Sequence, residues 1–388
     1  MAVYKLFPSQ DASIYSAYPA MNTGLDPILD VANYVTDFSP VSSVARSLIQ
    51  FDQGQINNVI DNIASVTSSF NFTASLKSFV AKATNVILES KIEAYPISGS
   101  WNNGSGEYLD NTQNTTGVSW VYSAFSGSTQ WPTSSYGALT TGSYSGSNNA
   151  GGAVWWTGSG GYTGIGSLEA TQSFNLRSEK DLELNVTDAV KVWYSSSNNL
   201  IGALPLISNE GFIVKWEDSK EFVTSSAVTP QLSFYSIDTN TIYPPQLEIK
   251  WRDFIYDTGS LEVINTPDLF VALDNNAGVF YSESINQFRL NVRPQFPVRI
   301  FETSSMYTKN HALPTSSYYA IKDLDTNEFV VDFDTQNTQI SCDTTGSYFT
   351  VYMNGLEPER YYQILVQTTV DNNTIVMDEN YYFKVVNG

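Results

Sequence analysis

The sequence contains almost no cysteine or histidine. Cys342 and His311 are the only residues of these two types among 388. A single cysteine excludes an intramolecular disulfide and a cysteine-based zinc cluster. A Ser–His–Asp or Cys–His site would have to use His311, whose surroundings, KNHALPTSS, are typical of a loop. Neither residue type therefore points to catalysis.

Basic residues and long apolar runs are also scarce. The chain has 19 Lys and Arg against 39 Asp and Glu, a net charge of −20. Binding to nucleic acid or to an anionic membrane requires clustered cations, and the sequence has no such cluster. No run approaches the roughly 18 apolar residues of a membrane span. The start, MAVYKLFPSQDASIY, lacks the apolar core of a secretory signal. We expect synthesis in a cytoplasm, with neither nucleic acid nor membrane as partner.

Acidic residues are plentiful but form no clear catalytic or metal-binding pattern. Glu107 and Asp110 could serve a glycosidase, although solvated loop charge is the favoured interpretation. The run 323–334, DLDTNEFVVDFD, begins like a calcium loop but has Glu328 at the glycine position, which favours a hairpin turn. The glycines of 158–166 lack the lysine of a phosphate-binding loop. We expect a protein that is not an enzyme and that binds no metal or cofactor.

Strand-forming residues dominate what the chain does contain. Aromatic residues make up 14% of it, and short apolar runs rich in Val, Ile, Tyr and Phe alternate with turn residues. Strands are expected at 47–51, 75–83, 86–97, 211–217, 230–237 and 245–251. Residues 181–196 predict a strand and then a short helix in which Val190 and Trp193 share a face. The pattern predicts an all-β fold.

One long segment, 111–168, has no Asp, Glu, Lys or Arg and is rich in Gly, Ser, Thr and Tyr. It also carries Trp120, Trp131, Trp155 and Trp156. A structureless loop of this length is uncommon inside a domain. We therefore expect ordered loops and short strands that pack on their own aromatic side chains.

Residues 4–255 resemble the DNRLRE family of β-sandwich domains in an ordered series of motifs. These are QDASIYSAYPAMNTGLDPILDV, ARSLIQFD, SGSWNNGSG…GVSW, LELNVTDAVKVWYSSSNNLIGALPL and TPQLSFYS. The resemblance implies a jelly-roll-like sandwich with long loops, similar to carbohydrate-binding modules. Trp101 and Trp120 stand where that family has paired tryptophans, and Trp193 stands in its D-V-T-x-x-V-x-x-W segment. All three are expected to be structural.

A new series of strand and turn signals begins near 257–267. The C-terminal part that follows resembles a fibronectin type III or immunoglobulin-like sandwich. The stretch NGLEPERYYQILVQT is similar to the fibronectin L-x-P-x-x-x-Y motif, which Leu356, Pro358 and Tyr362 would supply. The motif implies a tyrosine corner at Tyr362, where a buried hydroxyl binds back to the backbone. The expected domains are 1–257 and 267–388, with a linker at 258–266.

AYPISGSWNNGSGEY…TTGVSWVY and YPPQLEIKW also resemble virion structural proteins of large tailed phages, including T4-like cyanophages. This implies a non-enzymatic protein in the tail, baseplate, neck or capsid. It would be synthesised in the host cytoplasm and localised in the virion, multimeric within a symmetric particle and in contact with other virion proteins. The alternative is a carbohydrate-binding adhesion module that recognises host surface polysaccharide. In that case Trp155 and Trp156 are the candidate contact aromatics for glycan or partner.

Overall fold

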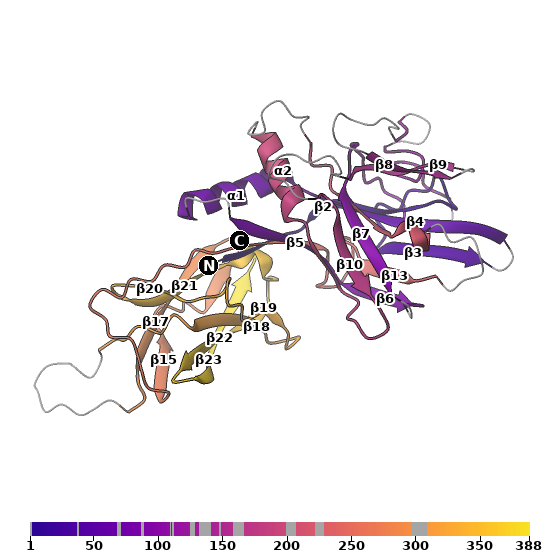
Figure 1. Ribbon diagram of the computed structural model, residues 1–388. Helices are drawn as coiled ribbons and strands as arrows, with labels where there is room; N and C mark the ends of the chain where they lie inside the picture. Colours follow the sequence, from indigo (N-terminus) through magenta and orange to yellow (C-terminus); the bar gives the residue numbers. More distant parts are fainter. Residues whose placement is uncertain are drawn as a thin grey trace, which may run out of the picture. The chain divides into compact units, whose positions relative to one another are not determined.

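A computed structural model describes residues 2–36, 39–67, 71–86, 89–108, 110, 112–124, 129–131, 141–146, 149–157, 167–198, 207–221, 229–296 and 309–388 (Figure 1). The fold is all-β, as predicted, with 48% strand and 10% helix. The chain packs as two compact units. The N-terminal unit comprises Leu6–Asp61 and Thr73–Glu248, and the C-terminal unit comprises Met1–Lys5, Asn62–Phe72 and Ile249–Gly388.

The first part of the chain forms β1 to β14 and three helices (Figure 1). Their bounds are β1 (Ala2–Leu6), β2 (Pro8–Tyr15), β3 (Ile28–Thr36), β4 (Ser39–Phe51), α1 (Gln53–Thr67), β5 (Phe72–Ser78), β6 (Val80–Thr84), β7 (Ser90–Pro96), β8 (Thr141–Gly146), β9 (Asn149–Trp156), β10 (Ala170–Phe174), β11 (Leu182–Asn185), α2 (Thr187–Ser197), β12 (Phe212–Trp216), α3 (Asp218–Glu221), β13 (Gln231–Tyr235) and β14 (Gln246–Trp251). The predicted strand and helix within 181–196 are β11 and α2, which confirms that prediction.

The N-terminal unit is built on one curled eight-stranded sheet of order β10-β7-β12-β4-β3-β13-β6, with β2 also paired to β4. Strand β4 is 13 residues long, so it can pair with β3 near its start and with β2 and β12 further along. All five residues of β12, FIVKW, are buried. Because successive side chains of a strand point to opposite faces, burial of all five means that this sheet is covered on both faces.

The C-terminal unit is a β-sandwich of two sheets, β15-β17-β21-β20 and β16-β23-β22-β18-β19. The bounds are β15 (Leu269–Leu273), β16 (Val279–Tyr281), β17 (Ile285–Pro294), β18 (Ser317–Asp323), β19 (Phe329–Val331), β20 (Ser341–Asp343), β21 (Gly346–Tyr352), the 3₁₀ turn η2 (Met353–Gly355), β22 (Tyr361–Val370) and β23 (Asn373–Val386). With the strands lettered A, A′, B, C, C′, D, E, F and G in chain order, the sheets are ABED and A′GFCC′. This is the immunoglobulin-like arrangement.

An aromatic core joins the two sheets of this sandwich. Tyr319 stacks on Phe349 with ring centroids 4.3 Å apart, and Phe349 stacks on Phe288 at 5.4 Å. Phe383 from β23 contacts both Phe288 and Tyr362. Aromatic pairs at these separations add to the stabilisation from buried area. The core therefore fixes the register of β17, β18, β21, β22 and β23.

Tyr362 forms the tyrosine corner that the sequence motif implied. It lies at the start of β22, its ring is buried, and its hydroxyl donates a hydrogen bond to the backbone oxygen of Glu357 at 3.0 Å. The bond ties the β21–β22 connection to the strand that follows it.

We expect Tyr362→Phe to lower the free energy of unfolding of the C-terminal unit by about 1 to 2 kcal/mol, because the Glu357 carbonyl loses its buried donor. Tyr361 is the matched control, since it precedes Tyr362 and is exposed. Urea unfolding followed by circular dichroism compares the two variants. Equal stability of Tyr361→Phe and Tyr362→Phe would show that the corner bond contributes nothing.

The stretch 258–266, predicted to be a linker, is part of the C-terminal unit. Tyr256 forms a parallel bridge with Cys342 of β20, and Val263 forms another with Ala312. Ile264 donates its N–H to Ala312 O at 2.9 Å and belongs to the sandwich core. The backbone is thus hydrogen-bonded along the sandwich instead of crossing solvent, and Ile264 anchors it in the core.

Candidate functional site

The tryptophans of the glycine-rich segment lie in the core of the N-terminal unit. Trp101, Trp120, Trp131 and Trp155 all belong to one buried cluster with Ile213 of β12 and residues of β2, β4 and β7. The indole of Trp101 donates a hydrogen bond to Glu210 O at 2.8 Å. Trp193 of α2 is also buried, with its ring 4.7 Å from that of Phe212. The described tryptophans of this region, Trp101, Trp120, Trp131 and Trp155, therefore pack on one face of the curled sheet.

Asn22 hydrogen-bonds to the backbone of the loops that pack over this sheet. Its Nδ2 donates hydrogen bonds to Asn103 O at 2.6 Å and Val118 O at 2.8 Å, and its Oδ1 accepts one from Gly106 N at 2.8 Å. Gly117 has φ +111°, and a Cβ there would lie 2.7 Å from Asn103 O. The glycines in this region are thus required by close backbone packing. The stretch 158–166 lies outside the described residues.

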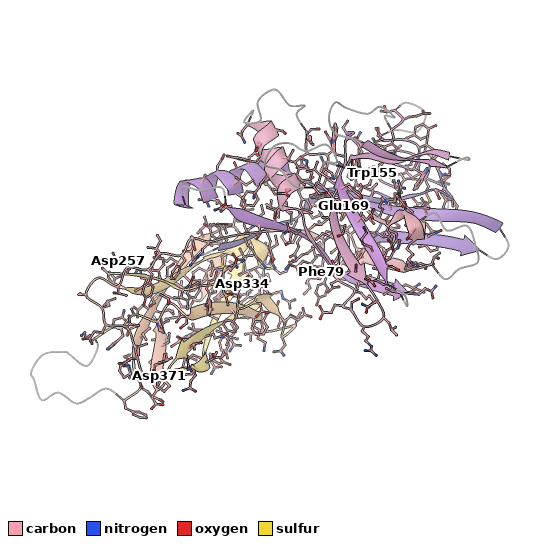
Figure 2. All side chains as sticks on the ribbon, in the orientation of Figure 1. Phe79, Trp155, Glu169, Asp257, Asp334 and Asp371 are labelled. Atoms are coloured by element: carbon pink, nitrogen blue, oxygen red, sulfur yellow. The ribbon has the colours of Figure 1, made fainter. Side chains whose placement is uncertain are left out.

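Trp155 and Trp156, the candidate contact aromatics, are both buried, with exposed fractions of 6% and 5%. Figure 2 shows Trp155 among the packed side chains of the N-terminal unit. A ring that stacks on a sugar must present a face to solvent, and neither ring does. Burial of both means that β9 is covered on both faces.

The same layer buries a pair of oppositely charged side chains. Arg46 of β4 and Glu221 of α3 are fully buried and form a bidentate ion pair, Nε–Oε1 2.6 Å and Nη2–Oε2 2.8 Å. The guanidinium also lies 4.9 Å from the Trp120 ring and 5.2 Å from the Trp155 ring, and it donates to Gly152 O. Cation–π contacts and a carbonyl acceptor complete the solvation that water would supply.

Lys215 of β12 extends this buried charge network. Its Nζ lies 2.9 Å from Asp218, 3.2 Å from Glu93 and 3.8 Å from Glu221. Glu93 also accepts a hydrogen bond from the hydroxyl of Tyr95, and burial together with the Glu93 charge raises the pKa of that tyrosine. Arg46 and Lys215 thus each lie beside at least one carboxylate. Such pairing of buried charges is typical of a network that stabilises the fold.

Asp11 of β2 is a buried carboxyl group in a different setting. Its Oδ2 accepts a hydrogen bond from Ile237 N at 2.8 Å. Burial raises the pKa of Asp11 from 3.8 to about 7; the Ile237 bond opposes this shift, and the nearby carboxylate of Asp238 adds to it. The folded chain therefore holds this proton more tightly than the unfolded chain.

We expect Asp11 to make the N-terminal unit less stable as pH rises. The contribution is complete below the unfolded pKa near 3.8 and is lost as pH rises through about 7. Asp11→Asn keeps an acceptor for Ile237 and cannot ionise. Its gain in stability over the wild type should therefore grow from about pH 4 to about pH 7 and approach about 4 kcal/mol, which is what a pKa raised from 3.8 to about 7 corresponds to. Urea unfolding at both pH values measures it, and parallel pH profiles of the two proteins would contradict the assignment.

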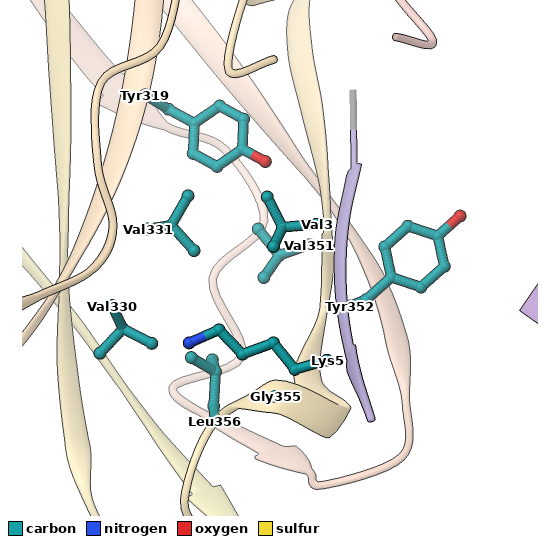
Figure 3. A pocket seen from close by; sticks show the side chains of 9 residues that line it. All are labelled: Val3, Lys5, Tyr319, Val330, Val331, Val351, Tyr352, Gly355 and Leu356. Atoms are coloured by element: carbon teal, nitrogen blue, oxygen red, sulfur yellow. The ribbon is translucent and has the colours of Figure 1, made fainter. Parts of the chain in front are cut away.

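The C-terminal unit contains a small pocket beside Lys5, Tyr319, Val330 and Leu356 (Figure 3). Its volume of about 10 Å³ has room for about one water molecule. His311 lies elsewhere in this unit, 3.9 Å from Glu262. Within the described residues, no group of three or more His, Cys, Asp or Glu is placed to hold a metal ion, and no helix is long and apolar enough to cross a membrane.

The outer face of the β16-β23-β22-β18-β19 sheet carries a row of exposed aromatic side chains. Residues paired across neighbouring strands share a face, and the register pairs Tyr281 with Val386, Tyr361 with Lys384, and Tyr382 with Gln363. The face so defined, here called the tyrosine face, consists of Val279, Tyr281, Tyr318, Ala320, Lys322, Phe329, Tyr361, Gln363, Leu365, Gln367, Val376, Tyr382, Lys384 and Val386. Of these residues, Ala320, Gln363 and Leu365 are buried.

Three tyrosines of this face are exposed to solvent. The exposed fractions of Tyr281, Tyr361 and Tyr382 are 63%, 52% and 43%. Their chain neighbours Phe280, Tyr362 and Phe383 point into the sandwich core. Sequence reasoning did not single out this face. The signal was present in the doublets YYQ and NYYF, where alternation places one ring inside and the other outside.

The tyrosine face is almost neutral. Its two lysines are Lys322 and Lys384, and Lys384 is paired with Glu359 while its Nζ lies 5.9 Å from the Tyr361 ring. Gln363 donates a hydrogen bond to Asp378 at 2.5 Å. Because the whole chain carries a net charge of −20, this is a region of low charge on a strongly acidic molecule.

Comparison with known proteins adds no assignment to these observations. No family model, no curated protein and no solved structure matches the chain.

Proposed function

We propose that this protein is a non-enzymatic structural component of a tailed-phage virion and that it works by assembly. The observation that supports the proposal best is the tyrosine face. Tyrosine, tryptophan and phenylalanine are enriched in protein interfaces and charged residues are depleted at their centres. A face with Tyr281, Tyr361 and Tyr382 exposed and little net charge has that composition.

The distribution of exposed apolar side chains supports an interface in the C-terminal unit. Eleven of the fifteen large hydrophobic residues that are exposed in the described chain belong to this unit. Six of them lie on the tyrosine face, namely Val279, Tyr281, Phe329, Tyr361, Val376 and Tyr382. Contiguous exposed apolar surface of this kind marks interaction sites.

The virion setting comes from the sequence resemblances to phage structural proteins and to DNRLRE domains. The tail, baseplate, neck and capsid are all compatible with it. Mass spectrometry of purified virions of the phage that encodes the protein tests this proposal. Peptides from the chain should be present at the level of other structural proteins, and their absence would defeat it.

A carbohydrate-binding adhesion module is the second candidate, and the same exposed tyrosine rings favour it, because sugars stack on aromatic faces. Trp155 and Trp156 do not contribute, since both are buried. A glycan array probed with the wild-type chain and with Tyr281→Ala distinguishes the two functions. Glycan binding that Tyr281→Ala abolishes would favour adhesion, and no binding by the wild type would favour assembly.

A further inference from the structure

We propose that the tyrosine face pairs with the same face of a second copy of this chain, forming a two-fold symmetric dimer. The proposal rests on the proposed assembly function and names the partner. A two-fold interface places one patch against itself, so the patch must be self-complementary. An apolar, nearly neutral patch meets that condition, whereas a patch with one sign of charge does not.

The charge balance of this face permits a second copy to approach it. Two copies that each carry a net charge of −20 repel one another wherever their acidic surfaces meet. The charged side chains at the tyrosine face balance in sign. Glu359 pairs with Lys384, and Asp378, which accepts the hydrogen bond from Gln363, carries a charge opposite to that of Lys322. Close approach of two copies through this face therefore meets little electrostatic repulsion.

The short edge strands of this sheet favour association through its face instead of through its edges. The two edge strands, β16 and β19, have three residues each. Short edge strands offer few free backbone groups to a neighbouring chain, which blunts edge-to-edge pairing. Two sheets that meet face to face instead align within about 30° and interdigitate their side chains. Tyr281, Tyr361 and Tyr382 provide the side chains that such packing needs.

The size of the face fits a weak dimer. The strands β16, β23, β22, β18 and β19 have 3, 14, 10, 7 and 3 residues. At about 3.3 Å per residue and about 4.8 Å between strands, they cover on the order of 600 Å² per copy. The total of about 1,200 Å² is at the lower limit of stable interfaces. The dimer should therefore dissociate on dilution, and salt should strengthen it, because screening weakens the repulsion between acidic copies more than it weakens apolar contact.

Sedimentation velocity of the full chain over a wide concentration range tests the proposal. The wild type should shift from monomer to dimer as concentration rises, and more strongly at high salt. Tyr281→Glu and Tyr382→Glu each place two like charges in the interface and should weaken dimerisation at least tenfold, with unfolding curves unchanged. Leu176→Glu is the matched control, because Leu176 is 70% exposed in the N-terminal unit; it should dimerise like the wild type.

Three outcomes would overturn the proposal. A wild type that stays monomeric at every concentration and salt level does so directly. A dimer that Tyr281→Glu and Tyr382→Glu leave intact places the interface elsewhere. The third outcome is a wild type that is monomeric, together with a Tyr281→Glu variant that no longer enters virions or no longer binds glycan. That result would assign the tyrosine face to a partner other than a second copy. Detection of the chain in purified virions is independent of all three, so failure of this inference is distinguishable from failure of the proposed function.

Discussion

Replacing Arg46 with methionine should lower the free energy of unfolding of the N-terminal unit by about 3 to 5 kcal/mol. The guanidinium is fully buried between the Trp120 and Trp155 rings and binds both oxygens of Glu221. Its removal leaves a carboxylate in the protein interior with Lys215 at 3.8 Å as a poorer partner. An uncompensated buried charge is among the costliest single changes a fold can receive.

Two comparisons separate the buried charge from other causes. Arg289→Met breaks a bidentate pair with Asp343 whose side chains are one-third exposed, and it should cost at most about 1 kcal/mol. The double variant Arg46→Met with Glu221→Met removes both charges and should recover much of the loss. Tryptophan fluorescence reports unfolding of the N-terminal unit, which holds seven of the eight tryptophans, and circular dichroism reports unfolding of the C-terminal unit, where Arg289 lies. An Arg46→Met variant no less stable than Arg289→Met would contradict the role of the pair.

Trp120→Ala should destabilise the same unit by about 3 to 5 kcal/mol, because the ring is fully buried and its removal leaves a large cavity. Trp101→Ala should act in the same direction and also leave Glu210 O without its indole donor. Tyr108→Ala is the control, since this aromatic side chain of the same region is 41% exposed. Urea unfolding measures all three, and a Trp101→Ala variant that folds normally and loses only glycan binding would reverse the structural assignment.

The strands and the tyrosine corner were predictable because their determinants are local. Alternating apolar residues and turn residues mark strands wherever they occur, and the L-x-P-x-x-x-Y spacing places Tyr362 at the start of β22. The structural assignment of Trp101 and Trp120 agrees with their burial. Each of these inferences uses residues within a short window of the sequence.

The buried ion pair could not be predicted in the same way. Arg46 and Glu221 are separated by 175 positions, and only the fold brings β4 and α3 together. A charged residue within the apolar run ARSLIQF was the one local clue. The burial of both Trp155 and Trp156 depends likewise on which layers cover β9. Which tyrosines are exposed depends on strand register. A shift of one residue would bury the exposed tyrosines and expose the buried ones.

The central claim, that this chain is a structural component of a virion, has one direct measurement. Quantitative mass spectrometry of gradient-purified virions from the phage proposed to encode it should detect the chain in a fixed ratio to known virion proteins. Repeated purification should not change that ratio. Virions that lack the chain, or a ratio that falls with each purification step, would contradict the account.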